Sequence, residues 1–570
     1  MSTSRLAVVI TLAAIGGARS GEAQATVTVR VDLAAARRSI DPRIYGVSWA
    51  GSADFAALNL PMNRWGGNAT TRYNWRANTD NRAADWFFES IPYASATEGA
   101  EADAFVSATR SGGAQPMVTI PVIGWVARTT PGREKLASFS VAKYGAQTST
   151  DGWFPDAGNG VSAATGQDIS GNDPNDASVL VDSSYQTDWV RHLVSRFGTS
   201  TAGGVRYYIL DNEPSIWWET HRDVAPVGVT MEDIRDRMIA HALGIKSVDP
   251  GAVVLGPEEW GWVGYFYSGY DHWHASLYGW GNFPDRNAHG GADVLPWLLD
   301  QMKLQEQHGG ERLLDVLSVH YYPQGGETGD DVSAAMQARR NRSTRSLWDP
   351  SYVDESWIND TVRLVPRMRG WIAGHYPGTR FGVTEYSWGA DGHINGATAQ
   401  ADVLGIFGRE GVDLANRWVS PQPGTPVYKA FQIYRNYDGR RSTFGEVSVL
   451  ASAPQPDQLA AFAAERARDH ALTVMLVNKT GAATTSAQFA HFAAAPAASV
   501  YQLTSANVIS RLADVPVSGS QITVSLPAQS ITLLVIPHAA RVTSRSRRTA
   551  AAASGAAFRC PCPRPTIAAS

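Results

Sequence analysis

Short hydrophobic runs alternate with longer amphipathic stretches between about residues 45 and 438 of the chain. The runs predict strands at 58–64, 117–123, 205–210, 253–256, 316–321 and 380–384, and the stretches predict helices at 185–197, 231–247 and 293–307. This alternation indicates a parallel α/β arrangement, and its length fits a (β/α)8 TIM-like barrel with insertions. An open doubly wound sheet is the alternative, but no phosphate-cradling glycine loop follows a strand.

The pattern changes on either side of this region. From about residue 439, short strands separated by turns are predicted at 444–450, 472–477 and 521–536. Within the last of these, Ile522, Val524 and Leu526 alternate with polar residues, which is typical of a half-buried antiparallel strand. We therefore predict a β-sandwich over residues 439–539, completed by a strand from residues 26–44. Residues 540–570 are rich in Ala, Arg, Ser and Pro, and we predict that they are disordered.

The first 25 residues have the pattern of a secretory signal peptide. Arg5 precedes an apolar stretch over residues 6–15, and a small-x-small pattern at 23–25 places the cleavage after Ala25. The apolar stretch is too short to span a bilayer. We predict a secreted protein, extracellular or periplasmic, without a membrane segment. The two cysteines, Cys560 and Cys562, lie in the tail, so no disulfide is expected in the folded body.

Composition narrows the classes of partner. The formal net charge of −4 gives no broad basic field, which argues against nucleic acid. The 19 Trp, 20 Tyr and 17 Phe exceed what a core alone suggests, and they suit a cleft that stacks sugar rings. We expect a polysaccharide as the binding partner, and we expect the protein to be a monomer.

Two glutamates close hydrophobic runs and carry the chemistry. Glu213 follows 207–212, and Glu385 follows 381–384. Strands of one barrel bring their C-terminal ends to one face, where two carboxyls about 5–5.5 Å apart form a retaining glycosidase pair. Glu213, preceded by Asn212, which can bind a sugar 2-hydroxyl, suits the acid/base, and Glu385 suits the nucleophile. Donors that could keep Glu385 ionised are Arg64, His320, Tyr321 and Tyr322.

Plainer interpretations compete with these assignments. Arg64 could instead brace the barrel through a salt bridge, and His320 could be a satisfied core histidine. Glu258 and Glu259 follow another strand and are rival carboxylates, although an adjacent acidic pair more often caps a helix or lines a subsite. The candidate sugar platforms, each as easily a core residue, are Trp65, Trp75, Trp217, Trp218 and Trp388.

Several segments together resemble glycoside hydrolase family 44. They are 63–68 (NRWGGN), 71–75 (TRYNW), 210–214 (LDNEP), 318–323 (SVHYYP) and 384–389 (TEYSWG). The resemblance covers roughly residues 26–538. It implies a barrel with a β-sandwich formed by both chain ends, Glu213 as acid/base, Glu385 as nucleophile, and endo-acting hydrolysis of β-1,4-glucan or xyloglucan.

A metal is a further hypothesis. Residues 151–160 and 171–176 are rich in Asp, Asn and Gly, and oxygen ligands of this kind suit calcium, although such loops are usually turns. The resemblance implies a structural calcium here, for which Asp151, Asp156 and Asp173 are the candidate ligands. No cofactor is expected for catalysis. His221, His272 and His274 show no tetrahedral zinc pattern.

The sequence thus predicts a secreted, retaining endo-β-1,4-glucanase that acts on xyloglucan or cellulose. A retaining hydrolase of xylan or mannan would carry the same two carboxylates and differ only in its subsites. A non-catalytic glycan-binding protein on the same scaffold is the rival outside the enzymes, and the presence of both carboxylates argues against it.

Overall fold

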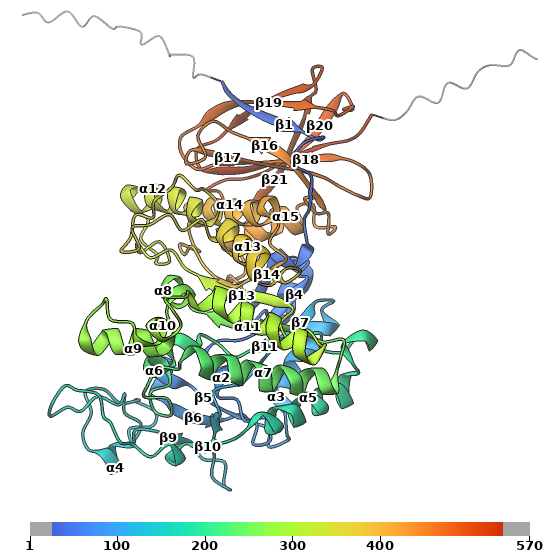
Figure 1. Ribbon diagram of the computed structural model, residues 1–570. Helices are drawn as coiled ribbons and strands as arrows, with labels where there is room; N and C mark the ends of the chain where they lie inside the picture. The colour runs from blue at the N-terminus through green and yellow to red at the C-terminus, as the bar shows by residue number, and fades with distance from the viewer. Residues whose placement is uncertain (1–25, 540–570) are drawn as a thin grey trace, which may run out of the picture.

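A computed structural model describes residues 26–539 and divides them into three stacked parts (Figure 1). A β-sheet domain lies at the top of that view, a barrel in the middle, and a lobe of barrel insertions at the bottom. The predicted signal peptide, the predicted disordered tail and both cysteines lie outside the described residues. Among the residues described, no helix is long and apolar enough to cross a membrane.

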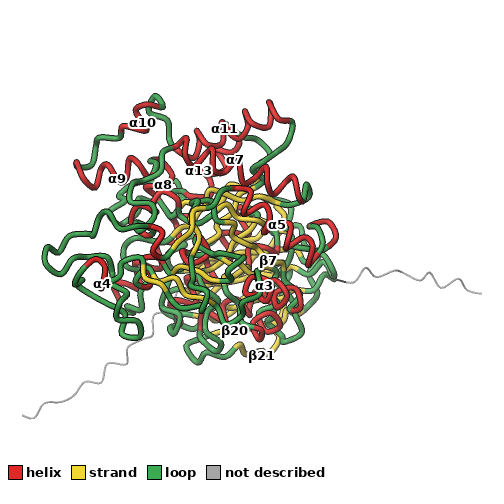
Figure 2. Tube along the Cα trace, turned by 90° about the horizontal axis from the view of Figure 1, so that it is seen from below, coloured by secondary structure: helices red, strands yellow, loops and turns green. Residues whose placement is uncertain are grey.

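Eight parallel strands close into the barrel, which confirms the predicted fold class and excludes the open sheet. In barrel order they are β3 (Gly46–Ser48), β4 (Met62–Trp65), β7 (Gln115–Ile120), β11 (Tyr207–Leu210), β12 (Val253–Glu259), β13 (Val316–Tyr321), β14 (Arg380–Tyr386) and β15 (Leu414–Arg417). Figure 2 shows strands near the centre of the molecule with helices around them. The main helices after the strands are α1 (Ser52–Ala57), α3 (Ala100–Ser111), α5 (Ser183–Phe197), α7 (Met231–Val248), α11 (Val294–Gly309), α13 (Leu364–His375), α14 (Ile394–Glu410) and α15 (Pro426–Arg435).

Local sequence fixes where these helices begin. Asp182 accepts hydrogen bonds from the backbone N–H groups of Ser184 and Tyr185 and so caps α5. Thr230 and Asp233 form a reciprocal capping box at the start of α7. The N-terminal ends of the barrel strands enclose an apolar cluster, which gives the barrel a packed floor. Its members are Met62, Met117, Tyr207, Ile209, Val253, Leu255, Val316 and Leu414.

The second domain is a mixed β-sheet built from both ends of the described chain, as predicted. Its main strands follow the order β21 (Ile509–Pro516), β20 (Ala497–Leu503), β23 (Ser530–Ile536), β18 (Leu472–Asn478), β17 (Leu459–Glu465), β16 (Val447–Ser452), β1 (Val27–Asp32), β19 (Ala483–Ala490) and β22 (Gln521–Leu526), and β2 (Arg38–Ser39) pairs with β16. β1 is antiparallel to β16 and parallel to β19, so the first strand joins the two halves of the sheet. Apolar side chains from both halves share one core.

Helix α14 joins this domain to the barrel. Its residues from Ile394 to Gly408 are all buried, because the helix lies between the barrel and strands β17, β18 and β23. An ion pair of 2.6 Å between Lys479 Nζ and Asp402 Oδ2 crosses the junction, with both side chains almost fully buried. A buried ion pair of this kind fixes the relative placement of the two domains more than it adds stability.

The lobe comes from the segments that follow β4 and β7. Its strands are β5 (Thr79–Asn81), β6 (Glu89–Pro92), β8 (Trp125–Ala127), β9 (Leu136–Ala137) and β10 (Ser178–Leu180), and α4 (Val141–Tyr144) lies among its loops. Since these segments leave the C-terminal ends of their strands, they build one wall above the barrel opening, the end at which barrel enzymes hold their active sites.

Candidate active site

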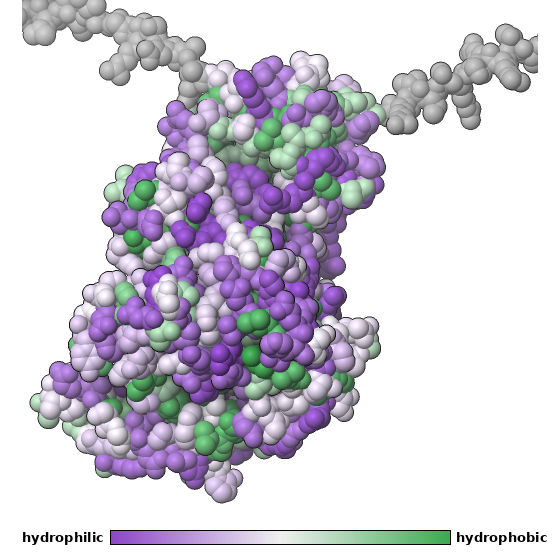
Figure 3. Space-filling model, viewed as in Figure 1, coloured by the Kyte–Doolittle hydropathy of each residue, from purple (hydrophilic) through white to green (hydrophobic). Residues whose placement is uncertain are grey.

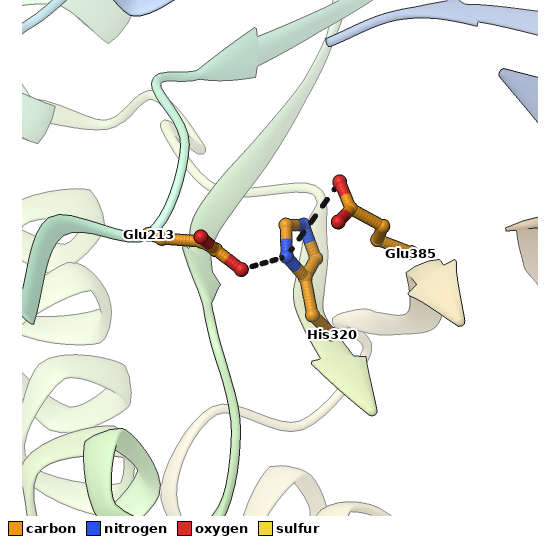
Figure 4. Close-up of side chains that lie close together, drawn as sticks. All are labelled: Glu213, His320 and Glu385. Atoms are coloured by element: carbon orange, nitrogen blue, oxygen red, sulfur yellow. Dashed lines mark hydrogen bonds and ion pairs between the residues drawn. The ribbon is translucent and has the colours of Figure 1, made fainter. Parts of the chain in front are cut away.

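Side chains from four barrel strands converge at the C-terminal end of the barrel. Glu213 follows β11, His320 belongs to β13 and Glu385 to β14, and the three side chains point toward one another (Figure 4). A carboxylate oxygen of Glu213, a ring nitrogen of His320 and a carboxylate oxygen of Glu385 all lie within 4.8 Å of one another. Arg64 reaches the same group from β4.

Glu385 is held by donors on both of its oxygens. Arg64 Nη1 donates to Oε2 at 2.6 Å, and the Tyr322 hydroxyl donates to Oε1 at 2.7 Å. His320 Nδ1 lies 3.8 Å from Oε2. A cation and a hydroxyl donor on its two oxygens offset the charge of this carboxylate and fix its orientation, as a nucleophile requires.

Glu213 has a contrasting environment. Its side chain is 15% exposed, and the one hydrogen bond the structure gives its carboxyl is with His320 Nδ1, at 2.9 Å from Oε1. Burial raises the pKa of Glu213 above its usual value, and the negative charge of Glu385 adds to the rise. The hydrogen bond with His320 lowers the pKa but does not cancel the effect of burial. The backbone at Glu213 has φ 50° and ψ 54°, in the left-handed region, which aims the side chain out of the regular strand direction. These conditions suit a carboxyl that carries a proton.

His320 lies between carboxylates on both sides of its ring. Nδ1 faces Glu213, and Nε2 lies 3.1 Å from Glu258 Oε2. Burial alone would lower its pKa, but the charge of Glu385 and the hydrogen bonds with Glu213 and Glu258 raise the pKa of His320 to about 10. The ring is therefore a cation at neutral pH.

Arg64 organises the group from below. The guanidinium is fully buried, and Nη2 donates to Asn212 Oδ1 at 2.9 Å and to Glu258 Oε2 at 3.3 Å. The glycine that follows Trp65 makes this possible, since a Cβ at Gly66 would lie 2.3 Å from the Arg64 guanidinium carbon. The Asn212 amide also donates to Asn68 at 3.3 Å, so Asn212 sits at the edge of the site with its orientation fixed.

Three predicted substrate contacts lie elsewhere. Trp65, Tyr321 and Trp388 are 1%, 1% and 2% exposed, and all belong to the core around the barrel. Side chains alternate along a strand, so Trp65 points away from the site that Arg64 enters, and Tyr321 points away from the site of His320 and Tyr322. None of the three offers a face to a sugar; they pack behind the site. Trp75 and Trp217 are also buried.

Other tryptophans line the open cleft, and of these the sequence analysis named Trp218 but missed Trp49, Trp86, Trp273 and Trp418. A cavity of about 470 Å³ borders the site, with Trp49, Trp86 and Trp418 among its lining residues. A second groove of about 1010 Å³ shares Trp86 with it and continues to Trp218 and Trp273. In the view of Figure 3, polar and apolar side chains are interspersed over the described surface. The signal for Trp418 was its position just after the last barrel strand, which is too short to stand out in the sequence.

Of the three candidate calcium ligands, Asp151 lies in an environment that fits a metal ion, whereas Asp156 and Asp173 have other roles. Asp151 is 1% exposed, and its Oδ2 and the buried Oε1 of Glu89 have no hydrogen-bond donor among the described residues. Burial and the Asp151 carboxylate raise the pKa of Glu89 to about 7, with Lys135 Nζ at 3.2 Å opposing the rise. Two adjacent carboxylates fit a hard cation, although Lys135 Nζ already lies 3.2 Å from Glu89 Oε2 and 3.9 Å from Asp151 Oδ2. Asp156 instead accepts a hydrogen bond from the Ala142 N–H, and Asp173 caps a 3-10 turn at Asn175.

A second group of two acidic residues and a histidine offers weaker support for a metal site. Glu232, Asp285 and His289 bring ligand atoms within 4.8 Å of one another. Both ring nitrogens of His289 are already engaged, Nδ1 with the Asp285 carbonyl at 2.8 Å and Nε2 with Glu232 at 2.7 Å. These contacts explain the group as a link between α7 and α10 (Pro284–Ala288).

Comparison with known proteins shows which family the chain resembles. The model of glycoside hydrolase family 44 matches residues 79–325. The chain is 30% identical over 515 residues to endoglucanase A of Paenibacillus lautus, spanning 84% of this chain and 67% of that protein. A second relative, a β-mannanase/endoglucanase A of Caldicellulosiruptor saccharolyticus, is 31% identical, and the match spans 34% of its length.

Solved structures are similar over the whole described region. CelM2, a bifunctional glucanase-xylanase from a metagenome library, superposes with a TM-score of 0.89 at 58% identity, covering 90% of this chain and 99% of that one. A family 44 xyloglucanase of Paenibacillus polymyxa gives a TM-score of 0.74 at 28% identity over the same shares of the two chains. The barrel, the paired carboxylates and these likenesses together show that this chain is a glycoside hydrolase and belongs to family 44.

Proposed function

We propose that the protein is a retaining endo-β-1,4-glucanase that acts on xyloglucan or cellulose-type chains. One observation carries the stereochemistry: carboxylate oxygens of Glu213 and Glu385 lie within 4.8 Å. Retaining glycosidases separate their carboxyls by about 5–5.5 Å, whereas inverting enzymes need about 6.5–9.5 Å to admit a water. The spacing supports direct attack by one carboxylate on the sugar.

The reaction follows from the two environments. The Glu385 carboxylate, oriented by Arg64 and Tyr322, attacks the anomeric carbon and forms a covalent glycosyl-enzyme. Glu213 gives its proton to the leaving oxygen as that bond breaks. Glu213 then accepts a proton from water, which displaces Glu385 from the anomeric carbon with a second inversion.

The open groove supports attack within a chain rather than at its end. Two hollows that share Asp85 and Trp86 in their linings, and that carry further tryptophans, can together hold several sugar rings. Two of the relatives are an endoglucanase and a xyloglucanase by name. Xylan is the second candidate substrate, because the 58% identical CelM2 is described as a glucanase-xylanase.

We further propose that Glu89 and Asp151 hold a structural calcium ion and that residues 1–25 direct export. The ion would brace the loop at Asp151 beside Trp86, whose ring stacks on Trp153 at 5.8 Å. Calcium would take no part in the reaction. A chelator is expected to lower the melting temperature of wild type and leave that of a Glu89→Gln/Asp151→Asn variant unchanged. N-terminal sequencing of exported protein is expected to begin at Thr26.

Reducing-sugar release from xyloglucan, carboxymethyl cellulose and xylan tests the activity, with Glu213→Gln beside wild type. Release from xyloglucan or cellulose, lost in the variant, supports the proposal. Release from xylan alone would mean that the same two carboxylates act on xylan rather than on a glucan. Binding without release on all three would favour a glycan-binding protein and contradict the proposal.

A further inference from the structure

Glu258, on the neighbouring strand β12, contacts two residues of the active site, Arg64 and His320. Its side chain is fully buried at the end of β12, and its backbone has φ 62°, in the left-handed region. Two other acidic residues nearby, Asp211 and Glu213, share positive φ values of 68° and 50°. Such conformations persist where the surrounding structure holds them, and they gather at functional sites.

A single oxygen of Glu258 lies between the two cations of the site. Oε2 is 3.3 Å from Arg64 Nη2 and 3.1 Å from His320 Nε2. Each of these cations in turn contacts one of the two reacting carboxyls, Arg64 at Glu385 and His320 at Glu213. The Glu258 carbonyl also accepts the Glu213 N–H at 3.0 Å. Glu258 thus lies one contact behind both reacting groups without reaching the cleft.

The charges of the site give this placement a consequence. Arg64 and His320 carry two positive charges, and the Glu385 carboxylate offsets one of them. Without Glu258, the buried group would carry an excess of one positive charge, which favours loss of the His320 proton. With ionised Glu258 the group is neutral when Glu213 is protonated.

The hydrogen bonds point the same way. With Nε2–H donated to Glu258, the ring presents Nδ1 to Oε1 of Glu213, and this leaves Oε2 of Glu213 for the glycosidic oxygen. A neutral ring carries one proton. With that proton on Nε2, the ring would present Glu213 with the lone pair of Nδ1 instead of an N–H donor. The other groups that face this ring are Arg64, Glu385 and Glu259.

We infer that Glu258 is a positioning residue for the acid/base step: its carboxylate keeps His320 protonated on both nitrogens, so that Nδ1–H is held on Glu213. This rests on the proposed function and assigns a role that the paired carboxylates alone do not require. Glu258 touches no substrate. Its effect passes through His320 and Arg64.

The neighbouring Glu259 supplies a matched control. It is also buried, and its carboxylate accepts a hydrogen bond from the Ser215 hydroxyl. Among the described residues it forms no hydrogen bond or ion pair with Arg64 or His320. Burial raises the pKa of Glu259 to about 8, so it is neutral at pH 7. Glu259→Gln therefore replaces an uncharged group, whereas Glu258→Gln removes a charge.

The test measures kcat and KM against pH for wild type, Glu258→Gln and Glu259→Gln on xyloglucan and on an aryl cellobioside with a very good leaving group. Glu258→Gln is expected to lower kcat on xyloglucan about 10- to 100-fold, to keep KM, and to move the basic limb of the profile to lower pH, because His320 then loses its proton more readily. The glycosylation rate on the aryl substrate, measured as kcat/KM, should change less than threefold, since breaking that bond needs no acid. Glu259→Gln should leave the basic limb in place.

Equal losses on both substrates with an unmoved basic limb would show that Glu258 only supports the fold, and would overturn the inference. So would a Glu258→Gln enzyme that behaves as wild type. Nitrogen-15 NMR of wild type, with His320 assigned by loss of its signals in His320→Gln, is independent of whether the Glu258 variant folds. A ring that is neutral at pH 7.5 contradicts the inference. If wild-type enzyme released no sugar from any glycan, the proposed function would fail instead.

Discussion

The two ends of the barrel interior use the same strands for opposite purposes. At the N-terminal end, β4, β12 and β13 contribute Met62, Leu255 and Val316 to a closed apolar floor. A few residues further on, the same strands contribute Arg64, Glu258 and His320 to a buried charged group. The floor stabilises the fold by removing apolar surface from water. The charged end costs desolvation, which its ion pairs only partly offset, and supplies the chemistry.

This difference teaches where a substitution should act. A change at the floor should alter the free energy of unfolding and leave the turnover of folded enzyme intact. A change at the charged end should alter turnover far more than stability. The strands are too short for the two roles to blend, so each side chain should fall clearly on one side.

Glu385→Ala is the strongest test, at the charged end. We expect turnover on xyloglucan to fall by about 10⁴-fold or more, because no nucleophile remains to form the glycosyl-enzyme. Azide should partly restore activity on an activated glycoside and yield the α-glycosyl azide. Product stereochemistry by proton NMR is the measurement. A β-azide from this variant would reverse the assignment of the two carboxyls.

Glu213→Ala should produce the next largest effect. Loss of the acid is expected to cost about 10²- to 10⁴-fold on xyloglucan, while substrates with very good leaving groups keep most of their glycosylation rate. Azide should here give the β-glycosyl azide. The same signatures in Glu258→Ala rather than Glu213→Ala would move the acid/base role to Glu258 and would also refute its role as a positioning residue.

How far the sequence predicted these two ends differs as well. The strand at 316–321 was predicted with the bounds that the structure gives it, because its apolar run is long and sharply ended. β3 and β15 have 3 and 4 residues, too few to show a periodicity, and both were missed. β12 was ended too early at Gly256, since Pro257 interrupts the run, although the strand continues to Glu259.

At the site, the sequence predicted which strand ends meet but not which side chain of each pair faces inward. Arg64 and Trp65 are adjacent, as are His320 and Tyr321, and one-residue alternation sends only the first of each pair to the site. The inward face can be assigned only when register with neighbouring strands is known, as between His320 and Glu385. The role of Glu258 was out of reach for the same reason, because it depends on a contact between three strands.

Leu255→Ala tests the other side of the comparison, at the floor. The side chain is fully buried, and its truncation should lower the free energy of unfolding by about 2–5 kcal/mol through lost transfer energy and a residual cavity. Chemical denaturation of the purified protein measures this, and kcat on xyloglucan at 25 °C should stay within twofold. Leu304→Ala, at a side chain 44% exposed on α11, should change stability by less than about 0.5 kcal/mol. A large loss of kcat in the Leu255 variant would mean that floor and site are coupled.

Glu259→Gln tests a buried residue at the charged end that the chemistry does not use, so its effect should be on stability at high pH. Burial raises the pKa of Glu259 to about 8, well above the value of about 4.3 for an unfolded glutamate. Between these values the folded state binds more protons than the unfolded state, so stability falls as pH rises through this range. His320, with a pKa raised to about 10, adds a loss of stability of the same sign that continues to higher pH.

The melting temperature of wild type should therefore fall between pH 5 and pH 9. The melting temperature of Glu259→Gln should fall less, and its free energy of unfolding at pH 9 should exceed that of wild type by about 1–3 kcal/mol. Equal slopes for the two proteins would mean that Glu259 ionises without cost, and the charged end would then be less desolvated than its burial indicates.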